Sequence, residues 1–161
     1  MSVDYIVSSL PTLAFDQPAP LTWARFVEIC GGAANVPRLA AWADLETQLR
    51  NAVAEARGGE KYKRAADGCS LYWKNRVLAC FQEKDVARRD ELLDRVWWDA
   101  AGELTAVASP LGKGALATYA VRLEIALRRT AISREKGSAA FDRLTAETKR
   151  SAKDFETEKV A

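Results

Sequence analysis

Histidine is absent from this chain of 161 residues. The sequence therefore lacks the commonest general base at neutral pH, and it can form neither a Ser–His or Cys–His nucleophile pair nor a metal site that contains imidazole. We expect no catalytic residue, no metal site and no cofactor, and we predict that the protein is not an enzyme. A mechanism based on carboxylates or lysine is the enzymatic alternative that the missing histidine leaves open.

Long apolar runs and an excess of one charge are also missing. No stretch approaches the roughly 18 apolar residues that suggest a membrane span. No cationic stretch precedes an apolar run near residue 1, so we expect no secretory signal. Lys and Arg together number 24 against 22 Asp and Glu, which leaves a net charge of +2. This mixed charge does not favour a dedicated nucleic-acid binder, and a cytoplasmic protein is the expectation.

Cysteine is scarce, and its three positions have no metal-binding spacing. Cys69 and Cys80 are separated by about three helical turns, which is too far for a disulfide within one helix. Together with Cys30 they form an odd set. Buried reduced thiols are the favoured interpretation, and a disulfide or metal role is the alternative.

Apolar residues recur every three or four positions in most of the chain, which is typical of helices that bury one face. The first such helix is expected after Thr22, as N-cap, and ends at the glycines of positions 31–32. The second opens at Pro37 and ends at the glycines of positions 58–59. These glycine pairs predict helix stops, because a phosphate-binding loop needs a Gly-Lys-Ser/Thr sequence after a strand.

The second half of the chain continues the helical pattern. A third helix is expected over 68–83, a fourth after the N-cap Asp85, and a fifth from a turn at 109–112 towards Ser133. Residues 138–161 predict a marginal helix that frays.

Residues 4–10 are β-branched and aromatic, which leaves open a short strand, an extended segment laid on helices, or the first turn of a helix. Prolines at positions 11, 18 and 20 predict an extended connector after them. The predicted fold is all-α: a compact bundle of five to six helices with a short extended N-terminal segment. We expect one helical domain over 1–145 and a marginally ordered helical tail over 146–161.

Charged clusters have an ordinary interpretation beside a functional one. Asp90 and Asp94 share a helix face, as a metal pair does, but the arginines between them favour a solvated ion-pair face. The basic cluster over 57–64 surrounds Tyr62, which makes a weak RNA or phosphate contact an alternative, although Glu60 and Asp67 dilute its charge.

Five residues are candidates for contact with a protein partner. Adjacent Trp97 and Trp98 point about 100° apart on a helix, so at least one faces a second layer, the periphery or a partner. Arg122, Glu124 and Arg128 follow a strongly apolar stripe. An exposed, solvated position is the favoured interpretation of these charged residues, and contact with a partner is the alternative.

Several motifs resemble a small uncharacterised bacterial family whose genes lie beside those of V-type ATPases. The motifs are a Tyr-x-x-Ser-Ser-Leu-Pro-x-Leu opening over 5–13 in this sequence, the Pro-Leu-Thr helix start over 20–22, and the segments 45–51, 92–98, 117–123 and 134–137. The later motifs also resemble the central-stalk C (d) subunit of V/A-type ATPases. In that subunit a Leu-Asp-Arg followed by two aromatic residues begins a helix, as residues 93–98 do here.

The resemblance implies a mechanical function without chemistry. A C-type subunit is a helical socket that sits on the membrane rotor ring and receives the central shaft, so these two parts are the implied partners. The C subunit is longer and contains similar helical units, and this chain would correspond to one of them or to a reduced version. Membrane contact would occur only through partner subunits. A helical adaptor or assembly factor outside the rotor, and a weak RNA or phosphate binder, remain alternatives.

Overall fold

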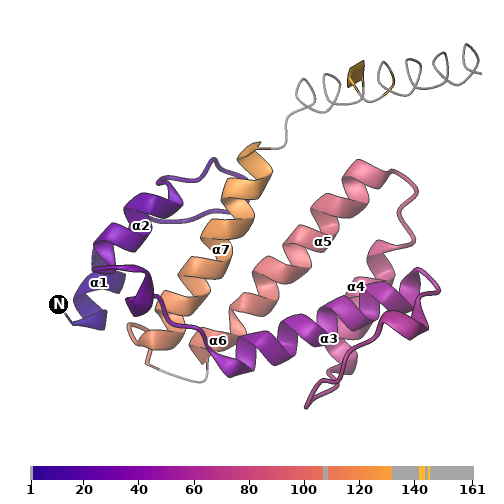
Figure 1. The fold of residues 1–161 in the computed structure, drawn as a ribbon, viewed down its shortest axis with the longest axis horizontal. Coiled ribbons are helices and arrows are strands. Elements are labelled where there is room, and N and C mark those ends of the chain that lie inside the picture. Colours follow the sequence, from indigo (N-terminus) through magenta and orange to yellow (C-terminus); the bar gives the residue numbers. More distant parts are fainter. Residues whose placement is uncertain (1, 107–108, 132–141, 144, 146–161) are drawn as a thin grey trace, which may run out of the picture. The chain divides into compact units, whose positions relative to one another are not determined.

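The structure is a computed structural model that describes residues 2–106, 109–131, 142–143 and 145. Residues 1–127 form one compact unit and residues 128–161 a second. Within the described ranges every regular element is a helix (Figure 1). Six α-helices have seven or more residues and α6 has four, which confirms the predicted all-α bundle. The predicted boundary at residue 145 falls inside the second unit and stays a prediction.

The N-terminal segment, for which a strand was one expectation, is a helix. Helix α1 spans Val3–Ser9, and the Ser2 side chain caps it by accepting a hydrogen bond from the backbone N–H of Tyr5. Ile6 is buried against other apolar side chains. A cap and one buried face therefore outweigh the strand preference of the β-branched residues. The proline-containing connector that follows has no regular element until Thr22.

Helix α2 spans Trp23–Ile29 and is capped by Thr22, as predicted. It ends at Gly31 and Gly32, which have φ of 76° and 121°, a backbone region that favours glycine. A short 3₁₀ turn, η1 (Ala33–Asn35), follows.

The predicted start of the next helix at Pro37 is wrong. Helix α3 spans Ala40–Ala56, because Leu39 still has extended backbone (ψ 130°) and serves as N-cap. Residues 36–39 instead form an irregular strap between η1 and α3, with extended backbone at Val36 and Leu39. Gly58, with φ of 69°, follows the end of α3, as expected of a helix stop. A second 3₁₀ turn, η2, spans Glu60–Tyr62.

The remaining helices follow the prediction with shifted ends. Helix α4 spans Leu71–Cys80, which is shorter than the predicted 68–83, because Ser70 caps its first turn. Helix α5 spans Val86–Ala101 and is capped by Asp85, as predicted. Helix α6 spans Glu103–Ala106 and α7 spans Lys113–Ala131. The predicted tail helix over 138–161 lies outside the described residues, apart from three positions.

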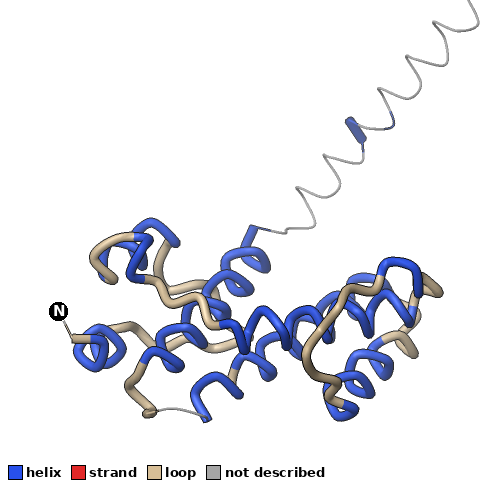
Figure 2. The backbone as a smooth tube through the Cα atoms, turned by 60° about the horizontal axis from the view of Figure 1, so that its bottom comes forward, coloured by secondary structure: helices blue, strands red, loops and turns tan. Residues whose placement is uncertain are grey.

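The helices of the first unit lie in two groups (Figures 1 and 2), and apolar side chains pack together within each group. The central group joins α3, α4 and α5 around Leu49, Val77 and Val96. The N-terminal group joins α1, α2 and α7 around Phe26 and Leu123. A third cluster, made by Phe15, Trp98, Ile125 and Ala126, connects the two groups along α5 and α7.

The cysteines depart in part from the prediction. Cys30 and Cys80 are buried free thiols, as expected, and burial raises the pKa of both. Cys69 is free but exposed, because it precedes the Ser70 cap in an irregular segment. Among the described helices, none combines the length and hydropathy needed to cross a bilayer.

Candidate functional site

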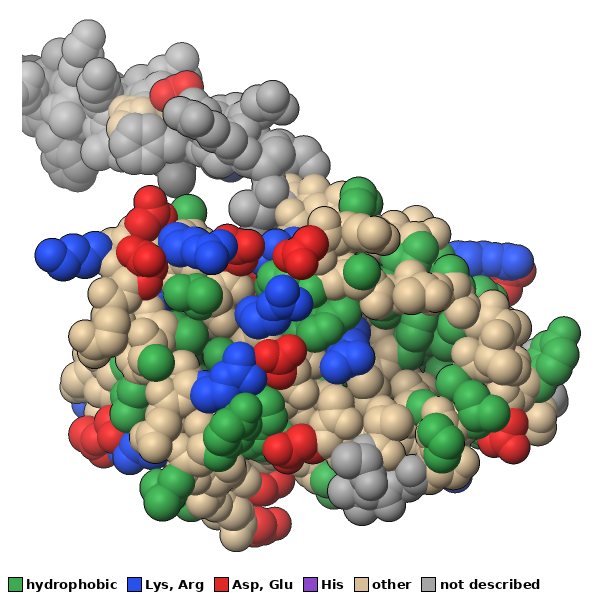
Figure 3. Space-filling model, turned by 180° about the vertical axis from the view of Figure 1, so that it is seen from behind, with side chains coloured by type: hydrophobic (Ala, Val, Ile, Leu, Met, Phe, Trp, Pro, Cys, Tyr) green, Lys and Arg blue, Asp and Glu red, His purple; other side chains and the backbone are tan. Residues whose placement is uncertain are grey.

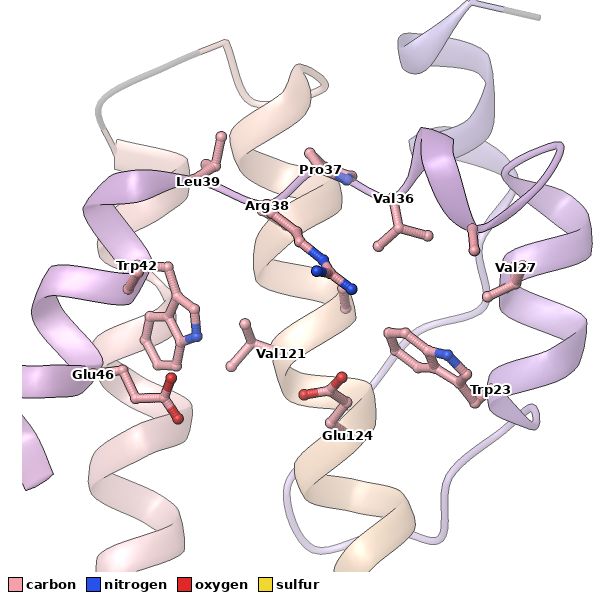
Figure 4. Close-up of a pocket in the computed structure, with 14 residues that line it drawn as sticks. Trp23, Val27, Val36, Pro37, Arg38, Leu39, Trp42, Glu46, Val121 and Glu124 are labelled. Atoms are coloured by element: carbon pink, nitrogen blue, oxygen red, sulfur yellow. The ribbon is translucent and has the colours of Figure 1, made fainter.

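A pocket lies where α2, the strap 36–39, α3 and α7 meet (Figure 4). Its volume is about 320 Å³. Because a tryptophan stands on each side, we call it the tryptophan pocket. The residues that line it include Trp23, Arg38, Trp42, Glu46, Val121 and Glu124. All of these residues belong to the first compact unit.

The two tryptophans are fixed by the cores behind them. Trp23 comes from the first turn of α2, and its ring lies 5.3 Å from that of Phe26, which is fully buried. Trp42 comes from the first turn of α3 and packs against the central group. Val121 of α7 lies between them in Figure 4. The aromatic walls are therefore positioned by folding, before any ligand binds.

Three charged side chains converge on the space between the tryptophans. In Figure 4 the guanidinium of Arg38 points from the strap into the pocket, and the carboxylates of Glu46 and Glu124 point towards its centre. Glu46 pairs with Arg50 one turn further along α3, with 2.8 Å between the nitrogen and the oxygen. Arg38 and Glu124 form no ion pair within 4 Å in the part of the chain that the structure describes. The pocket thus holds two charges of opposite sign that no contact neutralises.

The surroundings of Glu124 shift its acidity. Although Glu124 is an exposed residue, the pocket walls partly shield its carboxyl from water, and this desolvation raises its pKa. The nearby carboxylate of Glu46 raises the pKa further, and the positive charge of Arg38 opposes both effects. The net effect raises the pKa of Glu124 above its usual value, and an additional cation in the pocket would stabilise the ionised carboxylate.

The structure places two of the predicted contact residues, Arg122 and Trp98, against each other inside the first unit. The Nε of Arg122 donates to the backbone oxygen of Trp98 at 3.1 Å, and its guanidinium lies 5.1 Å from the Trp98 ring. Trp98 is buried and meets Phe15 edge-on at 5.6 Å. Gly102 makes room, because a Cβ there would lie 3.1 Å from a guanidinium nitrogen of Arg122. These residues join α5 to α7.

The other three predicted contact residues are more accessible. Trp97 is partly buried and packs on both the central group and the connecting cluster. Glu124 lines the tryptophan pocket. Arg128 is exposed in the last turn of α7 and belongs to the second unit. The structure therefore brings Arg122 and Trp98 together, but it places Glu124 on a different face of α7.

No local pattern in the sequence marked Arg38, Glu46, Trp23 or Trp42 as a site. Trp23 and Trp42 fitted the apolar stripes of two helices, and Glu46 occurs in one of the family motifs. The four-residue spacing of Trp42 and Glu46 places them on one helix face, which was the available signal. Their meeting with α7 depends on the packing of the two helix groups and had no local signature.

Two members of the basic cluster over 57–64 make contacts inside the fold. Lys63 pairs with Glu55 and Glu60, each at less than 3 Å, and the backbone of Arg64 exchanges two hydrogen bonds with the Asn51 side chain. On the face in Figure 3, basic and acidic side chains are interspersed. No group of three or more metal-ligating residues occurs among the described residues.

Comparison with known proteins found no relative of this chain. No family model, no curated protein and no solved structure matches the chain. The function is therefore inferred from the sequence motifs and from the tryptophan pocket itself.

Proposed function

We propose that this chain is a non-catalytic accessory or central-stalk-like (C/d-type) subunit of a bacterial V/A-type ATPase, which couples or assembles the rotary complex through protein–protein contacts. Two arguments support the proposal: the motif resemblance and the tryptophan pocket. The expected partners are the central shaft and the rotor ring, with no direct contact to nucleic acid. In this role the chain is cytoplasmic and reaches the membrane only through partner subunits.

The tryptophan pocket is the observation that carries the proposal. Tryptophan and arginine are enriched at protein interfaces, where a pocket that excludes water around an aromatic anchor contributes much of the binding energy. Arg38 and Glu124 are available to a partner without the loss of an internal ion pair. A surface of this kind supports binding by contact, which is what a coupling or assembling subunit does.

The predicted contact residues have different parts in this proposal. Glu124 contacts the partner directly, because it lines the pocket. Arg122 and Trp98 act indirectly by fixing α7 against α5. Trp97 and Arg128 remain candidates for additional contacts outside the pocket.

Affinity purification from the native host tests the proposal. The tagged full-length chain is expected to recover V/A-type ATPase subunits, identified by mass spectrometry, and the isolated chain is expected to show no ATP hydrolysis. An unrelated helical protein with the same tag serves as control. Recovery without any ATPase subunit, or substrate turnover by the isolated chain, would contradict the proposal.

Stoichiometry separates a permanent subunit from an assembly factor. A stalk-like subunit remains at one copy in the purified, active ATPase, whereas an assembly factor is found only with incomplete complexes. Quantitative mass spectrometry of complexes separated by size distinguishes the two. Both outcomes retain a contact function, but only the first retains the central-stalk interpretation.

A further inference from the structure

The tryptophan pocket has more acceptors for a cation than for an anion. Two carboxylates, from Glu46 and Glu124, and one guanidinium, from Arg38, line the pocket, and the Glu46 carboxylate also pairs with Arg50 at 2.8 Å. The aromatic faces of Trp23 and Trp42 add partial negative charge, which attracts cations. A phosphate would meet both carboxylates at close range, so the charge distribution disfavours nucleic acid and favours a positively charged group.

The shape of the pocket selects the size of the occupant. Its volume of about 320 Å³ is at the lower end of the roughly 300–1,000 Å³ that small-ligand sites occupy. Val121 and the indole rings provide apolar surface, and the two carboxylates reach the pocket from different helices, Glu46 from α3 beside Trp42 and Glu124 from α7. Lysine and arginine side chains have the matching form, because an apolar stem ends in a cationic head.

We propose that the tryptophan pocket binds a lysine or arginine side chain presented by a partner polypeptide, with the cationic head between Glu46 and Glu124. This inference rests on the proposed contact function. The stem of the bound side chain packs on Val121 and the tryptophan rings. The partner thereby supplies a cation for Glu124, which forms no ion pair within 4 Å among the described residues, beside Glu46, which pairs with Arg50.

Arg38 acts as an internal competitor for the same place. Its positive charge stabilises the ionised form of Glu124, and its side chain points into the pocket from the strap. It forms no ion pair within 4 Å in the described part of the chain, so no such contact holds it there. A bound basic side chain must displace or repel this guanidinium. Removal of Arg38 and removal of the Glu124 charge should therefore change binding in opposite directions.

Titration with N-acetyl-arginine methylamide, followed by NMR of the five indole N–H groups, tests this inference on the full-length chain. The resonances of Trp23 and Trp42 should shift and saturate at millimolar ligand. The N–H of Trp73 donates to Glu103 at 2.6 Å and serves as the internal reference. The corresponding citrulline derivative, a neutral analogue of similar shape, should cause no saturable shift. Equal shifts with citrulline would overturn the inference.

Paired variants make the test specific. E124Q should weaken binding about fivefold and R38A should strengthen it about threefold, as expected for single charge contacts at a partly shielded site. E28Q, which removes an exposed carboxylate on α2 outside the pocket, should leave the affinity unchanged. Thermal melting followed by circular dichroism checks that each variant is folded. Changes of the same sign in E124Q and R38A, or no change in either, would overturn the inference.

The result can be separated from that of the proposed function. If the wild-type chain recovers ATPase subunits and E124Q recovers them equally well, the contact function stands and the basic-side-chain inference fails. If the arginine probe binds as expected but no ATPase subunit is recovered, the proposed partner is wrong and the pocket chemistry stands.

Discussion

Arg122 and Glu124 lie two positions apart on α7, yet one is enclosed between helices and the other faces an open pocket. Residues two apart on a helix point about 200° away from each other, so the two charges meet different neighbours. Arg122 finds a carbonyl oxygen and an aromatic ring on α5. Glu124 finds a second carboxylate and a guanidinium that does not pair with it.

Structural and contact residues on one helix can be told apart by whether their polar groups are bonded inside the fold. A charged side chain whose hydrogen bonds are satisfied inside the fold contributes to stability, and its loss leaves a gap and an unpaired carbonyl. A charged side chain that remains unpaired at a pocket contributes little to stability and is available for binding. Substitutions on the two faces of α7 should therefore have separate effects on folding and on association.

The largest loss of stability is expected from a substitution of the buried residue that lies between Arg122 and Glu124 in the sequence. Leu123 is fully buried in the core of the N-terminal group. Leu123→Ala should lower the free energy of unfolding by about 3 kcal/mol, through lost apolar contact and the cavity that remains. Chemical denaturation measures the change. A loss below about 1 kcal/mol would mean that α7 is not packed as described.

The next effect is expected at the enclosed charge. Arg122→Ala should cost about 1–3 kcal/mol, because it removes a charged hydrogen bond to the Trp98 carbonyl and the contact with its ring. Burial lowers the pKa of Arg122, and Asp99 opposes this change. Arg122→Lys is the matched control, since it keeps the charge but lacks Nε and the planar fork, and it should recover only part of the stability. If Arg122→Ala were as stable as the wild type, Arg122 would not stabilise the fold and would not differ from Glu124 in this respect.

Tyr119, on the same helix, should make the stability of the N-terminal group fall in alkaline solution. Its hydroxyl donates to the backbone oxygen of Pro11 at 3.0 Å, and burial raises its pKa from 10 to about 12. The folded state therefore favours the neutral phenol. Its contribution is complete below the unfolded pKa and is lost as the pH rises through the folded pKa.

The stability should accordingly decrease between pH 10 and about 12. Tyr119→Phe should abolish this part of the decrease and cost about 1 kcal/mol at neutral pH. Denaturation at a series of pH values measures both effects. An identical alkaline decrease in the variant would show that other groups cause it.

The smallest effect is expected at the open charge. Glu124→Gln should change the free energy of unfolding by no more than about 0.5 kcal/mol, as is usual for exposed positions where solvent screens the charge. At pH values above the unfolded pKa of a carboxyl group, Glu124→Gln should be slightly more stable than the wild type. A raised folded pKa means that the contribution of Glu124 is lost as the pH rises through it.

Glu28→Gln, on an exposed face of α2, is the control for this substitution. A loss of more than 1 kcal/mol in Glu124→Gln alone would assign Glu124 to folding instead of binding. Such a result would place it in the same class as Arg122 and would remove the basis of the comparison.

The sequence predicted the helices better than the site, and the reasons are physical. Thr22 and Asp85 were predicted as caps because a capping side chain acts on its own helix within three residues. Pro37 was assigned to a helix start, but the strap stays non-helical up to Leu39. A proline at this position fits either conformation, and the tertiary path of the chain decides between them.

The pocket could not be predicted in the same way, because its charges come from three separate elements. Glu124 was a candidate from its place after an apolar stripe, whereas Arg38 gave no local signal. Only the packing of the N-terminal group beside the central group brings them to one pocket. The sequence showed which residues of α7 alternate between an apolar and a polar face. It did not show which helix each face would contact.

Site-specific photo-crosslinking in the native host tests whether the tryptophan pocket contacts an ATPase subunit. A photoreactive amino acid replaces Ala43, an exposed residue at the edge of the tryptophan pocket, and in a matched variant it replaces Tyr72, which is exposed on α4 outside the pocket. We expect crosslinks from position 43 to a V/A-type ATPase subunit, at a peptide that contains lysine or arginine, and none from position 72. Crosslinks from position 72 alone, or no crosslink to an ATPase subunit from position 43, would contradict this expectation.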